Sequence, residues 1–269
     1  MRDELGDRMK KNYENRTRIL LPRRTYTIIR VDGKAFHTYT RGCERPFDAG
    51  LMEDMDATAE YLCKNIQGAK IGFVQSDEIS VLMTDFETHQ TDAWFDGNIQ
   101  KIVSVASSMA TSKFNQLRMT RSMKEKEDMN IPYTSDFYEK MKLAEFDART
   151  FTIPSKTEVM NYFIWRQQDT VRNSISSVAQ SLYSSKELHG KNMSEQQEMI
   201  FQKGINWNDY DSTLKRGRFV FKEEVDMETD YKGTNFQQKN YKRNRWVARG
   251  CPTFTAEPLF LDLFIPEQD

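Results

Sequence analysis

The spacing of apolar residues near the start of the chain predicts a strand followed by a helix. Residues 26–31 form a β-branched run, which is typical of a buried strand. Between Asp48 and Gly68 the apolar residues recur at helical spacing, and these two residues suit the N-cap and the C-terminal stop of a helix. We therefore expect a strand at 26–31 and a helix over 48–68.

The following stretch predicts a hairpin, a second helix and another strand. Residues 69–74 and 79–84 are short apolar runs joined by the sequence Gln-Ser-Asp-Glu, which places carboxylates at the hairpin tip. Helical spacing returns over about 92–115, and a strand follows at about 145–153. The polar, aperiodic residues 118–136 predict a mobile loop between these two elements.

The order strand, helix, strand, strand, helix, strand is that of the split βαβ or ferredoxin-like arrangement. We therefore predict an α+β fold in which the first and third strands lie side by side at the centre of one sheet. In that topology the end of the first strand, at Asp32, lies close to the hairpin tip at Asp77.

The second half of the chain follows without a linker rich in Pro, Gly or Ser. Ser155 and Glu158 have the S-x-x-E spacing of a capping box, and helical periodicity resumes after them. Residues 215–224 (KRGRFVFKEE) have the pattern of a hairpin. We predict a palm-like catalytic core with an N-terminal helix over 1–154, and a helical and hairpin extension over 155–269 that packs on it as one structural unit.

Composition narrows the class of protein. Lys and Arg total 39 against 40 for Asp and Glu, so the formal charge is −1 and no overall basic field points to a nucleic-acid partner. The three cysteines and three histidines form no zinc-binding spacing. The start of the chain is too charged for a signal peptide, and no apolar run is long enough to span a membrane. We therefore expect a cytoplasmic protein without a membrane partner.

The pair Asp32-Gly33 at the end of the first strand has two interpretations. An Asp-Gly pair after a strand often forms only a tight turn. If Asp32 instead faces Asp77, two unit charges about 4 Å apart repel by roughly 4 kcal/mol at an effective dielectric constant of 20. A proton, a lysine or a divalent cation must then neutralise them, and oxygen ligands with room for water and phosphate favour Mg²⁺.

The residues around this pair suit a nucleotide. The Gly33 carbonyl offers a further metal ligand, and consecutive backbone amides of residues 33–37 can form an anion-binding nest. Two metal ions held by shared carboxylates support phosphoryl or nucleotidyl transfer. We expect Asp77, rather than the adjacent Glu78, to point at the metal. Positive charge nearby comes from three side chains: Lys34, His37 and Arg45.

Seven stretches resemble the tRNA-histidine guanylyltransferase family, above all its bacterial, archaeal and phage-type guanylyltransferase-like members. They cover most of the chain, and DG-x-x-FH followed by QSDE is the specific part. The stretches are LGDRMKKNYE (5–14), RVDGKAFHTYTRG (30–42), RPFD (45–48), IGFVQSDEISVL (71–82), WFDGNIQKIVSVASS (94–108), WRQQDTVRNS (165–174) and INWNDYDSTLKRG (205–217).

This resemblance implies a nucleotidyltransferase with a polymerase-like palm that adds nucleotides to the 5′ end of tRNA, opposite to the direction of ordinary polymerases. ATP or GTP first activates the 5′-monophosphate of the RNA. The 3′-hydroxyl of an incoming nucleoside triphosphate then attacks the activated end and expels a nucleoside monophosphate. The implied cofactors are two Mg²⁺ ions, the implied substrates are ATP, GTP and tRNA, and the implied assembly is a homotetramer.

Matching motif positions imply the site residues. The implied metal ligands are Asp32, the Gly33 carbonyl and Asp77, and the implied catalytic residues are the two aspartates with Glu78 as an outer-shell acid. The implied nucleotide-binding residues are Asp32, Gly33, Lys34, Ala35, Phe36, His37, Arg45, Asp48, Ser76, Asp77 and Lys101.

The tail near residues 231–249 interleaves basic residues with aromatic ones, a pattern suited to phosphate contact and base stacking. We take Lys242, Arg243 and Arg245 as RNA-binding candidates. A solvated surface with two aromatic residues docked on the core is the alternative.

One departure from the family bears on specificity. Eukaryotic guanylyltransferases carry a histidine in an H-I-N-N motif, which reads Val171-Arg172-Asn173-Ser174 here. The guanylyltransferase-like proteins, which repair 5′-truncated tRNA by copying the opposite strand, are the closer match. The alternatives are addition of a single G to tRNA-histidine, a cyclase or cyclic-dinucleotide synthase built on the same palm, and a non-catalytic RNA-binding protein.

Overall fold

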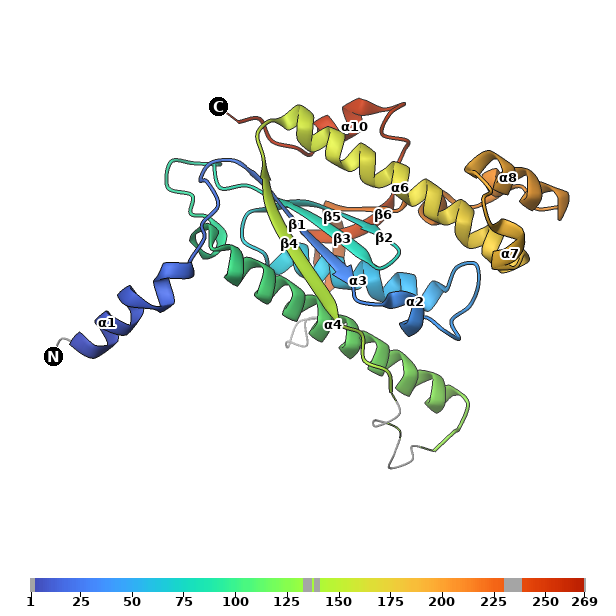
Figure 1. Cartoon of the computed structure of the whole chain (residues 1–269), viewed down its shortest axis with the longest axis horizontal. Helices are drawn as coiled ribbons and strands as arrows, with labels where there is room; N and C mark the ends of the chain where they lie inside the picture. Colours follow the sequence, from blue (N-terminus) through green and yellow to red (C-terminus); the bar gives the residue numbers. More distant parts are fainter. Residues whose placement is uncertain (1–2, 133–136, 138–140, 230–238, 269) are drawn as a thin grey trace.

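One six-stranded antiparallel sheet organises the protein, with strand order β4-β1-β3-β2-β5-β6 (Figure 1). The computed structural model describes residues 3–132, 137, 141–229 and 239–268. The order and pairing of the first elements confirm the predicted ferredoxin-like α+β arrangement. These elements are β1 (Tyr26–Gly33), α3 (Ala49–Asn65), β2 (Ala69–Gln75), β3 (Glu78–Met83), α4 (Ile99–Asp128) and β4 (Phe146–Ile153).

Strands β1 and β3 lie side by side, as the topology predicted, with Asp32 opposite Glu78. Because side chains alternate along a strand, one face of the sheet carries Ile29, Val31 and Val81 into the core beneath α3 and α4. The other face carries residues such as Ile28 into a second core. That second core includes Phe163 of the long helix α6 (Lys156–Leu182), which crosses this face in Figure 1.

Helix α4 is longer than its apolar periodicity predicted, and the loop expected over 118–136 is helical as far as Asp128. Charge contacts explain the difference. Arg118 donates to the buried Asp54 on α3 at 3.0 Å, and Arg121 binds both Asp54 and Glu53. These ion pairs fix a polar segment that shows no apolar stripe. Residues 133–136 of the expected loop lie outside the described residues.

Helix α6 begins where the sequence predicted, because the Ser155 hydroxyl accepts a hydrogen bond from the Glu158 amide at 3.3 Å. Its N-terminal half packs on the sheet, and its C-terminal half forms a smaller core around Ile175 and Val178. The helices that follow are α7 (Ser185–Leu188), α8 (Met193–Gln202) and α9 (Ser212–Arg216).

The hairpin predicted over 215–224 is wrong in its extent. That stretch contains the end of α9 and the start of a single strand, β5 (Arg218–Thr229), whose partner is β6 (Lys239–Gly250) in the basic tail. Residues 218–220 of β5 also pair with β2. Strands from the predicted extension therefore continue the sheet of the predicted core.

The remaining elements are short. Helix α1 (Glu4–Asn12) projects from the body in Figure 1, and α2 (Phe36–Tyr39) follows β1 directly. Helix α10 (Pro258–Asp262) packs near the start of α6, and single 3₁₀ turns occupy Glu14–Thr17, Trp94–Gly97 and Trp207–Asp209. Within the described residues no helix combines the length and apolarity that crossing a bilayer requires.

Candidate active site

The two aspartates predicted to meet are brought together by the pairing of β1 with β3. The Gly33 amide, directly after Asp32, donates a hydrogen bond to the Asp77 carbonyl at 3.1 Å. Ser76 and Asp77 form a two-residue turn between β2 and β3. The φ of Ser76 is 45°, in the left-handed region that non-glycine residues rarely adopt. The turn therefore holds Asp77 in a specific position beside the end of β1.

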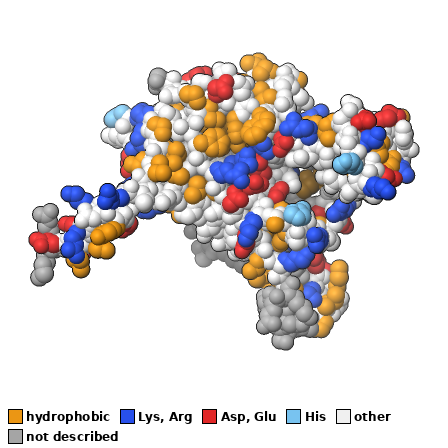
Figure 2. Space-filling view, in the orientation of Figure 1, with side chains coloured by type: hydrophobic (Ala, Val, Ile, Leu, Met, Phe, Trp, Pro, Cys, Tyr) orange, Lys and Arg blue, Asp and Glu red, His pale blue; other side chains and the backbone are white. Residues whose placement is uncertain are grey.

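Burial and neighbouring charges both act on these aspartates. Burial, together with the neighbouring Asp32 charge, raises the pKa of Asp77 above its ordinary value although hydrogen bonds oppose the shift. The Asp32 carboxylate lies 3.8 Å from Arg30 and 4.0 Å from Arg149, which is too far for hydrogen bonds. Figure 2 shows basic and acidic side chains gathered together in the middle of this face, over β1 and β4.

A metal ion would have few side-chain ligands here. No group of three or more His, Cys, Asp or Glu side chains in the described part of the chain is arranged to hold one. The available set is two carboxylates, Asp32 and Asp77, with the Gly33 carbonyl and water. A Mg²⁺ ion that keeps several waters and substrate phosphates fits that small set of hard oxygen donors.

Only part of the segment after Asp32 has backbone amides available for the predicted anion-binding nest. The Gly33 amide is used by Asp77, and the Lys34 amide donates to the Glu145 carbonyl at 2.8 Å. The amides available to an anion therefore begin at Ala35, which adopts the left-handed conformation, with φ 50°. The Phe36 ring is buried and lies against Gly33, where an added Cβ would come within 2.3 Å of it.

Lys34 does not face an anion site in this structure. Its ammonium group is exposed and binds the Glu145 carboxylate at 2.5 Å. The side chain thus ties the start of the segment to the residue before β4.

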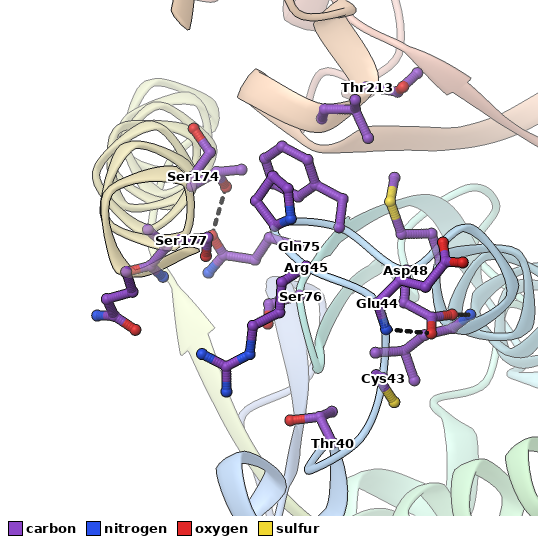
Figure 3. A pocket seen from close by; sticks show the side chains of 18 of the residues that line it. Thr40, Cys43, Glu44, Arg45, Asp48, Gln75, Ser76, Ser174, Ser177 and Thr213 are labelled. Atoms are coloured by element: carbon purple, nitrogen blue, oxygen red, sulfur yellow. Dashed lines mark hydrogen bonds between the residues drawn. The ribbon is translucent and has the colours of Figure 1, made fainter. Parts of the chain in front are cut away.

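A pocket of about 280 Å³ adjoins the Ser76 turn (Figure 3). One wall comes from residues 37–52, the opposite wall from α6, and the remainder from the end of β2 and from α9. Four of the predicted nucleotide-binding residues line it: His37, Arg45, Asp48 and Ser76. The lining residues that were not predicted include five polar ones from β2 and α6: Gln75, Thr170, Asn173, Ser174 and Ser177.

Arg45 and Asp48 play different parts in this pocket. Asp48 caps α3 by accepting hydrogen bonds from the Leu51 amide at 2.7 Å and the Glu44 amide at 3.1 Å. Burial opposes ionisation, but these bonds hold the pKa of Asp48 below its ordinary value, so it remains a structural anion. Arg45 is exposed, makes no ion pair within the described residues, and extends into the opening in Figure 3. It is the cation available to a phosphate.

Glu78, the predicted outer-shell acid, is turned toward α6. Its carboxylate is buried and accepts two hydrogen bonds from Arg166, both at 2.8 Å, while Arg30 lies 3.4 Å away. It stands opposite Asp32 in the sheet but does not line the pocket. Glu78 therefore fixes neighbouring arginines, and its role as an outer-shell acid stays a prediction.

Lys101 is not brought to this site. It lies in the first turn of α4, with its ammonium 5.9 Å from the centre of the Phe95 ring. Helix α4 meets the Asp32 end of the sheet at Thr111, whose hydroxyl accepts a hydrogen bond from the Phe146 amide. Ten residues of helix separate the two positions, which is about 15 Å.

The three RNA-binding candidates do not share one face of β6. Because strand side chains alternate, Lys242 points to the same side as Trp246, and Arg243 and Arg245 point to the other. Lys242 also binds Glu224 on β5 at 3.1 Å. Trp246 packs on the core, as the solvated-surface alternative supposed, so RNA contact in this tail stays a prediction for the two arginines.

A polymerase-type palm with paired aspartates at the end of β1 and at the β2–β3 turn defines a class, the palm nucleotidyltransferases. A sequence profile described as tRNAHis guanylyltransferase matches residues 6–154. A solved structure of a bacterial tRNA(His) guanylyltransferase-like protein in complex with ATP is 41% identical, with a TM-score of 0.78 over 97% of this chain and 99% of that chain.

Two further comparisons point to the same family. A bacterial tRNA(His) guanylyltransferase-like protein in complex with GTP is 40% identical, with a TM-score of 0.74 over 97% of this chain and 99% of that one. The tRNA(His) guanylyltransferase of Schizosaccharomyces pombe is 27% identical over 246 residues, which are 87% of this chain and 86% of that protein. The chain belongs to the tRNAHis guanylyltransferase family, and it is a nucleotidyltransferase.

Proposed function

We propose that this protein repairs 5′-truncated tRNA by adding nucleotides to its 5′ end, with the opposite strand as template and with ATP or GTP activating the 5′ phosphate. The observation that carries the proposal is the pocket beside the Ser76–Asp77 turn, with Arg45 extending into it. The similar bacterial proteins solved with ATP and with GTP support a nucleotide as its occupant.

Each part of the site has a distinct task in this reaction. Asp32, Asp77 and the Gly33 carbonyl would hold Mg²⁺, which supplies charge stabilisation at the reacting phosphates when bound. Arg45 and His37 hold the triphosphate at the mouth of the pocket, where their charge or hydrogen bonding meets its oxygens. The α6 wall excludes water from one side of the nucleotide.

The environment of Val171 favours templated selection. This side chain packs against the smaller core around Ile175, and an aliphatic group has no hydrogen bond to offer a base or a phosphate. The next residue, Arg172, donates to Asp169 at 2.8 Å and is committed to that ion pair. Selection of the added nucleotide then rests on pairing with the base opposite.

The test is extension of purified 5′-monophosphorylated tRNAs that lack one 5′ nucleotide and differ in the opposing base, with ATP and each nucleoside triphosphate in the presence of Mg²⁺. We expect the added nucleotide to change so that it remains complementary, and several tRNA species to serve. Addition of G whatever base lies opposite, and only to tRNA-histidine, would overturn templated repair.

That second outcome is the alternative function, addition of a single G, and the name of the Schizosaccharomyces pombe relative favours it. The palm fold is also compatible with nucleotide cyclisation. Incubation with GTP and Mg²⁺ alone should leave no cyclic product if the RNA end is the true acceptor.

A further inference from the structure

Trp165 is an exposed aromatic residue on the same face of the molecule as the paired aspartates. Its side chain, on α6, is 46% exposed, whereas most large aromatic residues of this face are buried. The Arg166 guanidinium lies 4.4 Å from the ring centre, and the Tyr162 ring meets it at 66° with centroids 5.9 Å apart. The exposed part of the indole therefore lies on the side away from Arg166.

The two side chains that pack against the indole are themselves held by hydrogen bonds. Arg166 is fixed by two hydrogen bonds to Glu78 and a third to Asp169. The Tyr162 hydroxyl is bonded to Ser80 on β3 at 2.7 Å. A flat, immobilised aromatic surface binds a planar ligand with little loss of side-chain entropy.

The indole is also close to the reacting end of the sheet. The Arg166 side chain beneath the ring binds Glu78, and Glu78 is the strand partner of Asp32. Arg149 adds a cation here: its side chain is 57% exposed and makes contacts of 3.7 Å to Asp147 and 4.0 Å to Asp32. An aromatic surface and an exposed arginine thus flank the place where an RNA 5′ end would react.

We infer that the exposed side of Trp165 stacks on an unpaired base of the RNA acceptor end, and that Arg149 contacts the adjacent phosphate. This inference rests on the proposed function. Paired bases already stack on their neighbours, so an unpaired base is the one with a free aromatic face. A stem whose 5′ strand is one nucleotide short presents such a base on its 3′ strand. Stacking on tryptophan is tolerant of base identity, which suits an enzyme that copies any template.

The test compares two 5′-monophosphorylated stem RNAs, one with a 3′ overhang and one blunt-ended. We expect Trp165→Ala to weaken binding of the overhanging RNA by about 5- to 150-fold, the range for loss of one base stack, and to leave blunt RNA binding unchanged. Trp165→Phe should retain most of the affinity. Phe201→Ala, which removes an aromatic side chain that is 63% exposed on α8, is the matched control and should bind as wild type does.

A fluorescent base gives a second readout, and its wild-type measurement needs no variant. With 2-aminopurine as the first unpaired base, wild-type protein should quench its fluorescence on binding, and Trp165→Ala should not. Absence of quenching in the wild-type complex, or equal RNA affinities for wild type and Trp165→Ala, would overturn the stacking inference. Arg149→Ala should flatten the salt dependence of binding by about 0.7, and an unaltered slope would remove Arg149 from the contact.

The two proposals fail separately. If wild-type protein extends truncated tRNA but binds overhanging and blunt RNA equally, the stacking inference is wrong and the proposed function stands. If it extends no RNA, yet its preference for the overhang depends on Trp165, the proposed reaction is wrong and the RNA-binding surface stands. ATP affinity should be the same in wild type and Trp165→Ala, which checks that the pocket is intact.

Discussion

Arg166 binds Glu78 through two parallel hydrogen bonds of 2.8 Å, and both side chains are buried between α6 and β3. This ion pair joins the long helix to the strand that follows the Ser76–Asp77 turn. A motif acid that sequence places in the reaction is therefore a structural anchor as well. Its loss should affect folding as much as chemistry.

Arg166→Met should lower the free energy of unfolding by about 3–5 kcal/mol, because it leaves the Glu78 carboxylate buried without its main partner. The measurement is denaturant unfolding without nucleotide. Arg172→Met is the matched control, since Arg172 is 49% exposed and its pair with Asp169 contributes about 0–1 kcal/mol. Equal effects of the two substitutions would show that Glu78 does not depend on Arg166.

Asp32→Asn and Asp77→Asn should each reduce nucleotidyl transfer by about 10² to 10³, the scale for removing one preorganised electrostatic contact. Both substitutions keep side-chain size, and each removes one of two neighbouring like charges. Thermal stability without Mg²⁺ should therefore stay level or rise. Single-turnover assays and thermal melts of the same preparations decide the matter, and near-normal turnover in either variant would refute the metal-site assignment.

The raised pKa of Asp77 predicts a pH dependence of stability in the absence of metal. The folded protein binds this proton more tightly than the unfolded chain, so stability falls as pH rises from the ordinary aspartate range through the raised pKa. Asp77→Asn should remove this part of the decline. Melting temperatures across mildly acidic pH provide the comparison, and parallel curves for wild type and variant would contradict the shift.

Filling the pocket should block the nucleotide without disturbing the fold. Ser177→Trp places an indole among the lining residues of the α6 wall, and we expect nucleotide affinity to fall at least about tenfold, or ~1.4 kcal/mol. Gln168→Trp adds the same side chain at an exposed position of α6 and should leave affinity unchanged. Calorimetric titration with ATP compares the pair, and equal affinities would place the nucleotide elsewhere.

Substitutions on the two faces of β6 test whether the basic tail binds RNA. If Arg243 and Arg245 contact RNA phosphates, replacing both with Ala should flatten the salt dependence of tRNA binding by about 0.7 to 0.9 for each lost contact. Lys242→Ala, on the opposite face and beside Glu224, should change the slope less. Binding isotherms at several salt concentrations give the slopes. A slope that neither change affects would leave this strand as a solvated surface.

The sequence predicted the palm well because its strands and helices carry strong apolar periodicity, and the pairing of Asp32 with the Asp77 turn follows from topology alone. The sequence did not predict the extension of α4. Arg118 and Arg121 stabilise this part of the helix through ion pairs with α3, and α3 is far away in the sequence, so the pairs leave no local pattern. The pairing of β5 with β6 was also not predicted, because strand pairing across a long connection has no local signal in the sequence.

The pocket residues on α6 were also not predicted from the sequence. Its α6 wall includes Thr170, Ser174 and Ser177, small polar residues that have no chemistry of their own. Their spacing of four and three residues forms one polar stripe along a face of the helix, and this stripe was the available signal. That the stripe faces Arg45 could only be learned from the fold.

The pairing of β2 with β5 has a consequence for how this protein can be divided. Gly72, Phe73 and Val74 share backbone hydrogen bonds with residues 218–220, which come from the far end of the sequence. A fragment that stops at residue 154 would leave these groups unpaired on an exposed apolar strand, and such an edge recruits strands from other chains. We expect that fragment to aggregate, and we therefore infer that the stretch matched by the family profile needs the later strands in order to fold.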